Sequence, residues 1–368
     1  MHVVAQVAAL PGLAPRAVAQ IVADSWAAKR PDDELTVLPV SDGFSVDVVG
    51  TGLDDVQPGE SVLDRTDPRR FVSIAGTSAL IDLASGLTFR GGEPRGDTRF
   101  LADDVLDLLS RGVTSIQIHV PSLMVGSDLG IGFLSGLSGV SLDIARVSDL
   151  SRLADALTKA KARLAGVSVV LTYPAEQRLT GVDGMTRGWV RLGFDALAAQ
   201  ESERLIVSWA SAIGSTAAGL GSLLLGSSKP DPRSVFSGVG GGLGFTLGAI
   251  GVPVHTIGRF QMVGKSAAFA DADLVLAVTS AIGVDIPTTV HEAVAIAEES
   301  GIPVCLLADS SGLRTNELAK LGIHGSYEIR PERAFLTEVE PETPESIASV
   351  PESLANAVGK IARTWGHD

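Results

Sequence analysis

Short apolar runs alternate with helical stretches along this chain, and this alternation constrains its fold more than any other feature. The N-terminal run HVVAQVAAL precedes PRAVAQIVADSWAAKRP, whose apolar residues recur at helical spacing, and a second apolar run, DELTVLPV, follows. Further runs are TSIQIHV, GVSVVLTY, ADLVLAVT and IPVCLLAD, separated by helical stretches such as DDVLDLLSRG and VHEAVAIAEESG. Strands that alternate with helices in this way predict an α/β fold with mainly parallel strands.

The length and the distribution of these runs predict more than one domain. The chain has 368 residues, enough for about two or three domains. Its C-terminal third returns to the strand and helix rhythm of the N-terminal stretch. We therefore expect one domain built from both chain ends, residues 1–62 and 236–368, with a second α/β domain, residues 63–235, inserted in it.

Charge and cysteine content exclude several classes of partner and site. The formal net charge of −14 would repel a phosphate backbone, so nucleic acid is not expected as a partner. The single cysteine, Cys305, excludes an intramolecular disulfide and a thiolate metal cluster and fits a reducing cytoplasm. The N-terminus lacks the basic region of a signal peptide.

Two uncharged stretches, Leu205–Ser228 and Ser234–Gly258, are long enough to cross a bilayer, which takes about 20 residues. Both are diluted by Gly, Ser, Thr and Pro, and neither has flanking aromatic anchors. We expect buried helices or loops there and no membrane span.

The second of these stretches contains the glycine-rich segment FSGVGGGLGFTLGAIG, which spans residues 236–251. Its spacing does not match the dinucleotide motif G-x-G-x-x-G, and no predicted strand precedes it. Glycines let backbone N–H groups approach an oxyanion at a helix N-terminus, so the segment could be an anion-binding loop. Close helix packing through small residues explains it equally well at this point.

Other candidate motifs are incomplete. GRFQMVGKS, residues 258–266, has one residue too many for a phosphate-binding P-loop, so Lys265 is expected to be a surface lysine. The six histidines show no metal-ligand spacing, although His119 ends an apolar run and is either buried or functional. Asp42 and Asp128 each stand near glycine beyond a predicted strand end, where α/β proteins place ligands and where turns also occur.

Taken in order, the segments resemble the two-domain bacterial glycerate kinases over nearly the whole chain. The likeness begins at VVAQVAALPGLAPRAVAQIVADSWAAKRPDDELTVLPVSDG and continues through TSIQIHVPSLMVGSDLGIGFLSGL, the glycine-rich segment and ADLVLAVTSAIGVDIPTTVHEAVAIAEESGIPVCLLAD. The resemblance implies a Rossmann-like or flavodoxin-like parallel-sheet domain, made from both chain ends, with a second α/β domain inserted in it. It also implies an active site in the cleft between them and phosphoryl transfer from Mg-ATP to D-glycerate.

The chain departs from this family where the family is most polar. The family ends its first strand with Asp-Ser and then Lys, and these positions are Val7, Ala8 and Leu10 here. Its Gly-Glu-Gly-Arg-x-Asp signature falls on residues 278–283, Val-Thr-Ser-Ala-Ile-Gly, and the lysine that follows is also missing. Phosphoryl transfer depends on carboxylates that hold Mg²⁺ and on cationic donors, so these replacements predict a loss of catalysis.

At a smaller number of positions this chain keeps the residues of the family's site motifs, and the resemblance implies roles for them. The substrate cleft would retain Asp42, Gly43, Asp128, Gly130 and Gly132, of which Asp42 and Asp128 are weak catalytic candidates. No metal ligand is assigned. Nucleotide or phosphate binding would involve the retained glycines: Gly238, Gly240, Gly241, Gly242 and Gly244.

Three functional readings follow. In the first, the protein is a pseudokinase that binds a small-molecule ligand or another protein, as a regulatory or interaction partner. In the second, it is an active kinase on D-glycerate or a related hydroxy acid, requires Mg-ATP, and takes catalytic groups from elsewhere, such as Asp285, Asp273, His119 or Lys265. In the third, it is a structural subunit whose cleft is filled by Phe44, Leu10 and Val7.

Overall fold

The computed structural model separates the chain into two compact units. The terminal unit comprises Met1–Thr51 and Ile257–Asp368, and the inserted unit comprises Gly52–Thr256. Within them the structure describes residues 1–41, 43, 71–83, 98–124, 128–143, 147, 149–221, 230–263, 265–283, 286–333 and 343–366.

The second domain boundary differs from the expected one. Residues 236–256 belong to the inserted unit, because β7 (Val254–Thr256) pairs with β6 (Ser168–Tyr173) in the sheet of that unit. The first expected boundary, at residue 62, lies outside the described residues.

The terminal unit is built on a five-stranded parallel sheet with the strand order β10-β9-β8-β1-β2. Its central strands are near-continuous apolar runs, as expected for parallel strands that are covered on both faces. The strands are β1 (His2–Val7), β2 (Glu34–Pro39), β8 (Leu274–Thr279), β9 (Val304–Ala308) and β10 (Gly325–Glu328).

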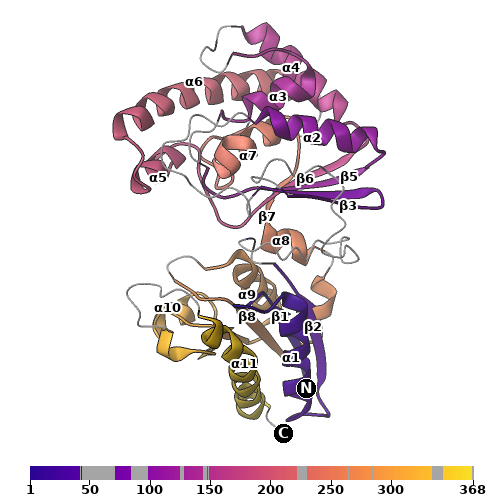
Figure 1. Ribbon diagram of the computed structural model, residues 1–368, viewed down its shortest axis with the longest axis vertical. Helices are drawn as coiled ribbons and strands as arrows, with labels where there is room; N and C mark the ends of the chain where they lie inside the picture. The colour runs from indigo at the N-terminus through magenta and orange to yellow at the C-terminus, as the bar shows by residue number, and fades with distance from the viewer. Residues whose placement is uncertain are drawn as a thin grey trace. The chain divides into compact units, whose positions relative to one another are not determined.

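Helices cover both faces of this sheet (Figure 1). Alternate residues of β1 point to opposite faces: Val3 and Val7 pack with α1 (Pro15–Ala27) and α11 (Pro344–Trp365), whereas Val4 packs with α9 (Thr288–Ser300). The other helical segments of the unit are α8 (Ile257–Met262), α10 (Thr315–Lys320) and the 3₁₀ turns Ser266–Phe269 and Pro331–Arg333. The result is a three-layer α/β/α unit.

The inserted unit has a mixed five-stranded sheet in the order β3-β4-β5-β6-β7. The strands β3 (Phe71–Ala75) and β4 (Ser78–Asp82) are antiparallel, and β4, β5 (Ser115–His119), β6 and β7 run parallel. The carboxyl ends of these four parallel strands therefore meet at one edge.

The helices of the inserted unit lie on one side of its sheet in Figure 1 and share a single hydrophobic core with it. They are α2 (Arg99–Ser110), α3 (Ile131–Ser138), α4 (Leu150–Arg163), α5 (Met185–Arg191), α6 (Ala196–Gly221) and α7 (Val239–Ala249). The uncharged stretch from Leu205 forms the second half of α6, where Ile206, Trp209 and Ile213 are buried in this core. Among the helices of the described ranges, none has the length and apolar character needed to span a bilayer.

Candidate functional site

The carboxyl edge of the terminal sheet is where the family resemblance places polar catalytic groups. The strands β1 and β8 are neighbours, with Val7 beside Val278, and the Ala8 N–H donates to the Val278 carbonyl over 2.9 Å. Val7, Leu10 and Val278 are buried in the core formed with α1 and α11, and Ala8 is buried in the core on the α9 side. The replaced positions are thus adjacent to one another and packed in apolar surroundings.

The polar groups at this edge mainly form hydrogen bonds with other groups of the protein. The Gln6 side-chain amide donates to the Thr289 carbonyl of α9 over 2.8 Å. The Ser41 N–H donates to Gln261 Oε1 over 2.9 Å, and the Gly43 N–H donates to Ser41 Oγ over 3.1 Å. The bond to Gln261 ties the start of the loop after β2 to α8. Asp42 lies outside the described residues.

Two polar atoms at the same edge are buried without a hydrogen-bond partner: Gln6 Oε1 and Thr279 Oγ1. Gln6 lies on β1 and Thr279 ends β8, the neighbouring strand. An amide oxygen and a hydroxyl supply neither the carboxylate nor the cation that phosphoryl transfer requires.

A buried ion pair at the end of β9 was not predicted from the sequence. Arg330 donates to both carboxylate oxygens of Asp309, from Nε over 2.7 Å and from Nη2 over 2.6 Å. The two side chains are only 3% and 4% exposed, and the Arg330 N–H also donates to the Asp309 carbonyl over 2.8 Å. The pair joins the ends of β9 and β10. Asp309 carried a signal, because it directly follows the apolar run of β9, but the sequence before Arg330 is not an apolar run and nothing in it identifies the partner.

In the inserted unit, Asp128 is surrounded by hydrogen-bond donors. Its carboxylate accepts from the Thr98 N–H over 2.9 Å, from the Thr98 hydroxyl over 2.8 Å, and from the N–H groups of Gly130 and Gly132, each over 2.9 Å. The Thr98 hydroxyl oxygen accepts from the Phe133 N–H over 2.9 Å. Asp128 therefore joins the starts of α2 and α3, and both of its oxygens are occupied.

Burial raises the pKa of Asp128, and the hydrogen bonds from Thr98, Gly132 and Gly130 oppose that rise without cancelling it. The folded state therefore binds the proton more tightly than the unfolded state, whose carboxyl group has the ordinary pKa of 3.8. By linkage, the contribution of Asp128 to the free energy of unfolding is fully present below pH 3.8. It falls as the pH rises from 3.8 through the pKa of the folded state.

We expect the Asp128→Asn variant, whose side chain does not titrate, to lack this pH dependence. The stability of the wild-type protein relative to the variant should fall with rising pH, by about 1.4 kcal/mol for each unit by which the pKa is raised. Urea unfolding of both proteins at several values between about pH 4 and 7 measures the difference. A relative gain for the wild type with rising pH would mean that hydrogen bonding outweighs the cost of burial.

The glycine-rich segment forms the start of α7 in a non-helical conformation. Gly240, Gly241 and Gly242 have φ values of 57°, 68° and 97°, in the left-handed region that other residues rarely adopt. The N–H groups of Gly238 and Gly240 donate to the carbonyls of Gln177 and Pro121, each over 2.8 Å. These contacts favour the packing interpretation for those two N–H groups. A phosphate-binding role for the segment stays a prediction.

Two of the predicted site segments lie together in the inserted unit. The Thr246 hydroxyl of α7 donates to the Leu129 carbonyl over 2.6 Å. A Cβ atom on Gly130 would lie 3.2 Å from side-chain atoms of both Leu243 and Thr246. The glycines after Asp128 and those of the glycine-rich segment therefore allow α3 and α7 to approach closely.

A row of polar side chains crosses four parallel strands of the inserted sheet. Asp82 on β4, His119 on β5, Thr172 on β6 and His255 on β7 are successive register partners at the carboxyl ends of these strands. The first three are buried. Sequence reasoning identified only His119, because the pairing of Thr172 with His255 joins segments far apart in the chain.

Thr172 contacts the side chains of two residues of the neighbouring strand β5. Thr172 Oγ1 accepts from the Gln117 side-chain amide over 3.1 Å and lies 2.9 Å from His119 Nδ1. Hydrogen bonds through this hydroxyl therefore link Gln117, Thr172 and His119 across β5 and β6. His119 lies at the edge where α/β sheets place ligands.

The remaining candidates are dispersed. Asp273 accepts a hydrogen bond from the His2 N–H over 2.7 Å. It lies at the amino ends of β1 and β8 in the terminal unit, at the opposite edge of the sheet from Val278. Lys265 is half-buried just before the turn Ser266–Phe269. Phe44 and Asp285 lie outside the described residues. Across the described ranges, no three His, Cys, Asp or Glu side chains are grouped so that they could hold a metal ion.

The two units, one on a parallel sheet and one on a mixed sheet, define a two-unit α/β protein. The sequence model of the glycerate kinase family matches residues 11–365, so the chain belongs to the glycerate kinase family. This confirms the resemblance and the α/β fold class. A solved structure described as a glycerate kinase 2 from Salmonella typhimurium LT2 is similar in fold, with a TM-score of 0.66 and 18% sequence identity over 99% of this chain and 98% of that chain. No curated protein sequence matches the chain.

Proposed function

We propose that this member of the glycerate kinase family has lost phosphoryl transfer and acts by binding a small-molecule ligand or a partner protein. The observation that carries the proposal is the pairing of β1 with β8. At this edge Val7 and Ala8 stand where the family has Asp-Ser, beside Val278, the first residue of the replaced signature. All three side chains belong to packed apolar cores.

The described residues of this edge do not fit Mg-ATP. Binding and transfer of a phosphoryl group require carboxylates for Mg²⁺ and cationic donors for the phosphates. Asp309 stands at the end of β9, but Arg330 occupies both of its oxygens, and each group neutralises the charge of the other. Asp42 and Asp285 lie outside the described residues, so their contribution is tested by substitution.

The test is a coupled assay with Mg-ATP and D-glycerate, run beside an active enzyme of the family. One missing cationic group can cost about 10³- to 10⁵-fold in rate, so we expect turnover at least about 10³-fold below that enzyme. Turnover within tenfold of the active enzyme would overturn the proposal. In that case, loss of the activity in Asp42→Asn and Asp285→Asn variants would identify these carboxylates as replacement catalytic groups.

A further inference from the structure

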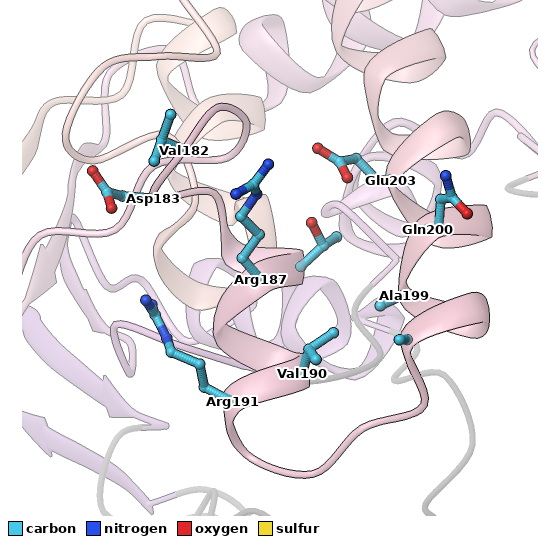
Figure 2. Close-up of a pocket in the computed structure, with 10 residues that line it drawn as sticks. Val182, Asp183, Arg187, Val190, Arg191, Ala199, Gln200 and Glu203 are labelled. Carbon is cyan, nitrogen blue, oxygen red and sulfur yellow. The ribbon is translucent and has the colours of Figure 1, made fainter.

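A pocket of about 540 Å³ lies in the inserted unit, between α5, α6 and the loop that precedes α5. This volume is typical of sites for small ligands. Figure 2 shows side chains from all three segments around it. The lining residues that matter here are Val182, Asp183, Thr186, Arg187, Arg191 and Glu203.

The charged side chains that line this pocket are two arginines and two carboxylates. Arg187 and Arg191 are four residues apart on α5, so they lie on the same face of that helix. Within the described part of the chain, neither guanidinium group makes an ion pair or a hydrogen bond. In Figure 2 the Arg187 side chain extends between those of Asp183 and Glu203. The pocket thus has free cationic donors beside two carboxylates.

A buried polar atom points to the same place. Thr186 lines the pocket and is only 2% exposed, and its hydroxyl has no hydrogen-bond partner. A buried hydroxyl without a partner is unfavourable, because it has lost water without gaining a bond. A polar ligand atom in the pocket could supply the missing bond.

Apolar surface adjoins these polar groups. Val182, which is 75% exposed, and Val190, which is 41% exposed, both line the pocket. Apolar contacts with a few placed polar groups are the usual composition of a small-ligand site.

We propose that this pocket binds a small organic acid. Its carboxylate or phosphate group contacts Arg187 and Arg191, because planar guanidinium groups bind both kinds of oxyanion through paired hydrogen bonds. Its hydroxyl or ammonium group donates to Glu203, and its carbon atoms contact Val182 and Val190. The carboxylates of Asp183 and Glu203 repel a ligand that carries only negative charge. The site therefore selects a ligand that carries both an anionic group and a hydrogen-bond donor. The proposal does not depend on the loss of phosphoryl transfer, because it uses none of the residues at the terminal sheet.

The test uses the full chain with isotope-labelled valine methyl groups, whose chemical shifts are measured by NMR. The protein is titrated separately with four probes: L-serine, D-glycerate, 3-phosphoglycerate and inorganic phosphate. We expect saturable shifts at Val182 and Val190 with at least one organic acid and at least tenfold weaker binding of inorganic phosphate. A preference for 3-phosphoglycerate over D-glycerate would identify a phosphate as the anionic group, and the reverse order would identify a carboxylate.

Three variants and a control make the test specific. Arg187→Ala and Arg191→Ala should each weaken binding at least tenfold, because each removes a charge-assisted hydrogen bond. Thr186→Val should weaken binding about tenfold without lowering the unfolding midpoint, because it removes a hydroxyl that lacks a partner in the free protein. The control Arg163→Ala makes the same charge change at an exposed position on α4 and should bind normally.

The proposal is overturned if none of the four probes shifts Val182 and Val190 at concentrations up to about 10 mM, beyond the millimolar range of weak affinities. It is also overturned if the arginine variants bind as tightly as the wild type. Shifts confined to Val7 and Val278 would place the binding in the terminal unit instead and would equally exclude the pocket.

Discussion

Replacement of Arg330 by alanine should lower the free energy of unfolding of the terminal unit by about 3–5 kcal/mol. The substitution removes the partner of a carboxylate that is 4% exposed and leaves its charge buried without compensation. It also removes donors to both oxygens of Asp309, at the point where the ends of β9 and β10 are joined. Asp309→Ala should cost a similar amount for the same reason.

Unfolding in urea should be followed separately for the two units, because a two-unit chain need not unfold in one step. Fluorine-labelled tryptophan provides this, since Trp26 is buried in the terminal unit and Trp189 in the inserted unit. The transition reported by Trp26 should move, and that reported by Trp189 should not.

Two control variants separate the ion pair from other effects of substitution. Arg363→Ala removes an exposed arginine of α11 and should change stability by no more than about 0.5 kcal/mol. The double variant Asp309→Leu with Arg330→Met removes both charges and should lose much less than either alanine variant, because no unpaired charge remains. A loss of under about 1 kcal/mol in Arg330→Ala would show that the carboxylate finds water or another partner.

The strands that the sequence predicted are those with long apolar runs. HVVAQVAAL contains β1, DELTVLPV contains β2, and ADLVLAVT contains β8, whose six residues are all buried. In β1 and β8, which lie inside a sheet covered on both faces, burial selects such residues, so the local sequence is sufficient to identify the strand. The edge strand β2 is only partly buried, and its apolar residues alone identified it.

Four strands were not predicted: β3, β4, β7 and β10. In β4 four of the five residues are buried, so that strand was missed although it carries this signal, whereas β7 and β10 lack it. The strand β7 has three residues, Val-His-Thr, and β10 reads Gly-Ser-Tyr-Glu. Both are edge strands, and neither shows a run of buried apolar side chains. The positions of these strands depend on pairing with segments distant in the sequence. Because β7 pairs with β6, the terminal unit resumes at residue 257 and not at the expected residue 236.

The roles of charged residues were the least predictable part of the site. Asp128 was predicted as a cleft residue because glycine and a strand end stand near it. The donor that decides its surroundings, Thr98, is 30 residues away in the sequence. Asp309 and Arg330 are 21 residues apart, one after β9 and the other after β10. A sequence locates a carboxylate, but what it binds depends on which segments the topology brings together.

Replacement of Gly244 by alanine should destabilise the inserted unit by about 3 kcal/mol or more. Gly244 is buried in α7, and a Cβ atom there would overlap the Phe236 carbonyl oxygen and approach Val239 Cγ2 to 2.7 Å. A backbone carbonyl cannot rotate away as a flexible side chain can, so α7 or the preceding turn must shift. The transition reported by Trp189 measures this loss.

Gly248→Ala is the matched control, four residues later on the same helix. A Cβ atom at Gly248 would lie 3.6 Å from Phe236 Cε2, an ordinary packing contact. Because glycine costs a helix about 0.5–1 kcal/mol relative to alanine, this variant should be equally stable or slightly more stable than the wild type. Both substitutions keep the backbone N–H group. If the glycines served only to present N–H groups to a phosphate, both variants would leave the free protein unchanged, whereas a large loss in Gly244→Ala alone means that close packing requires that glycine.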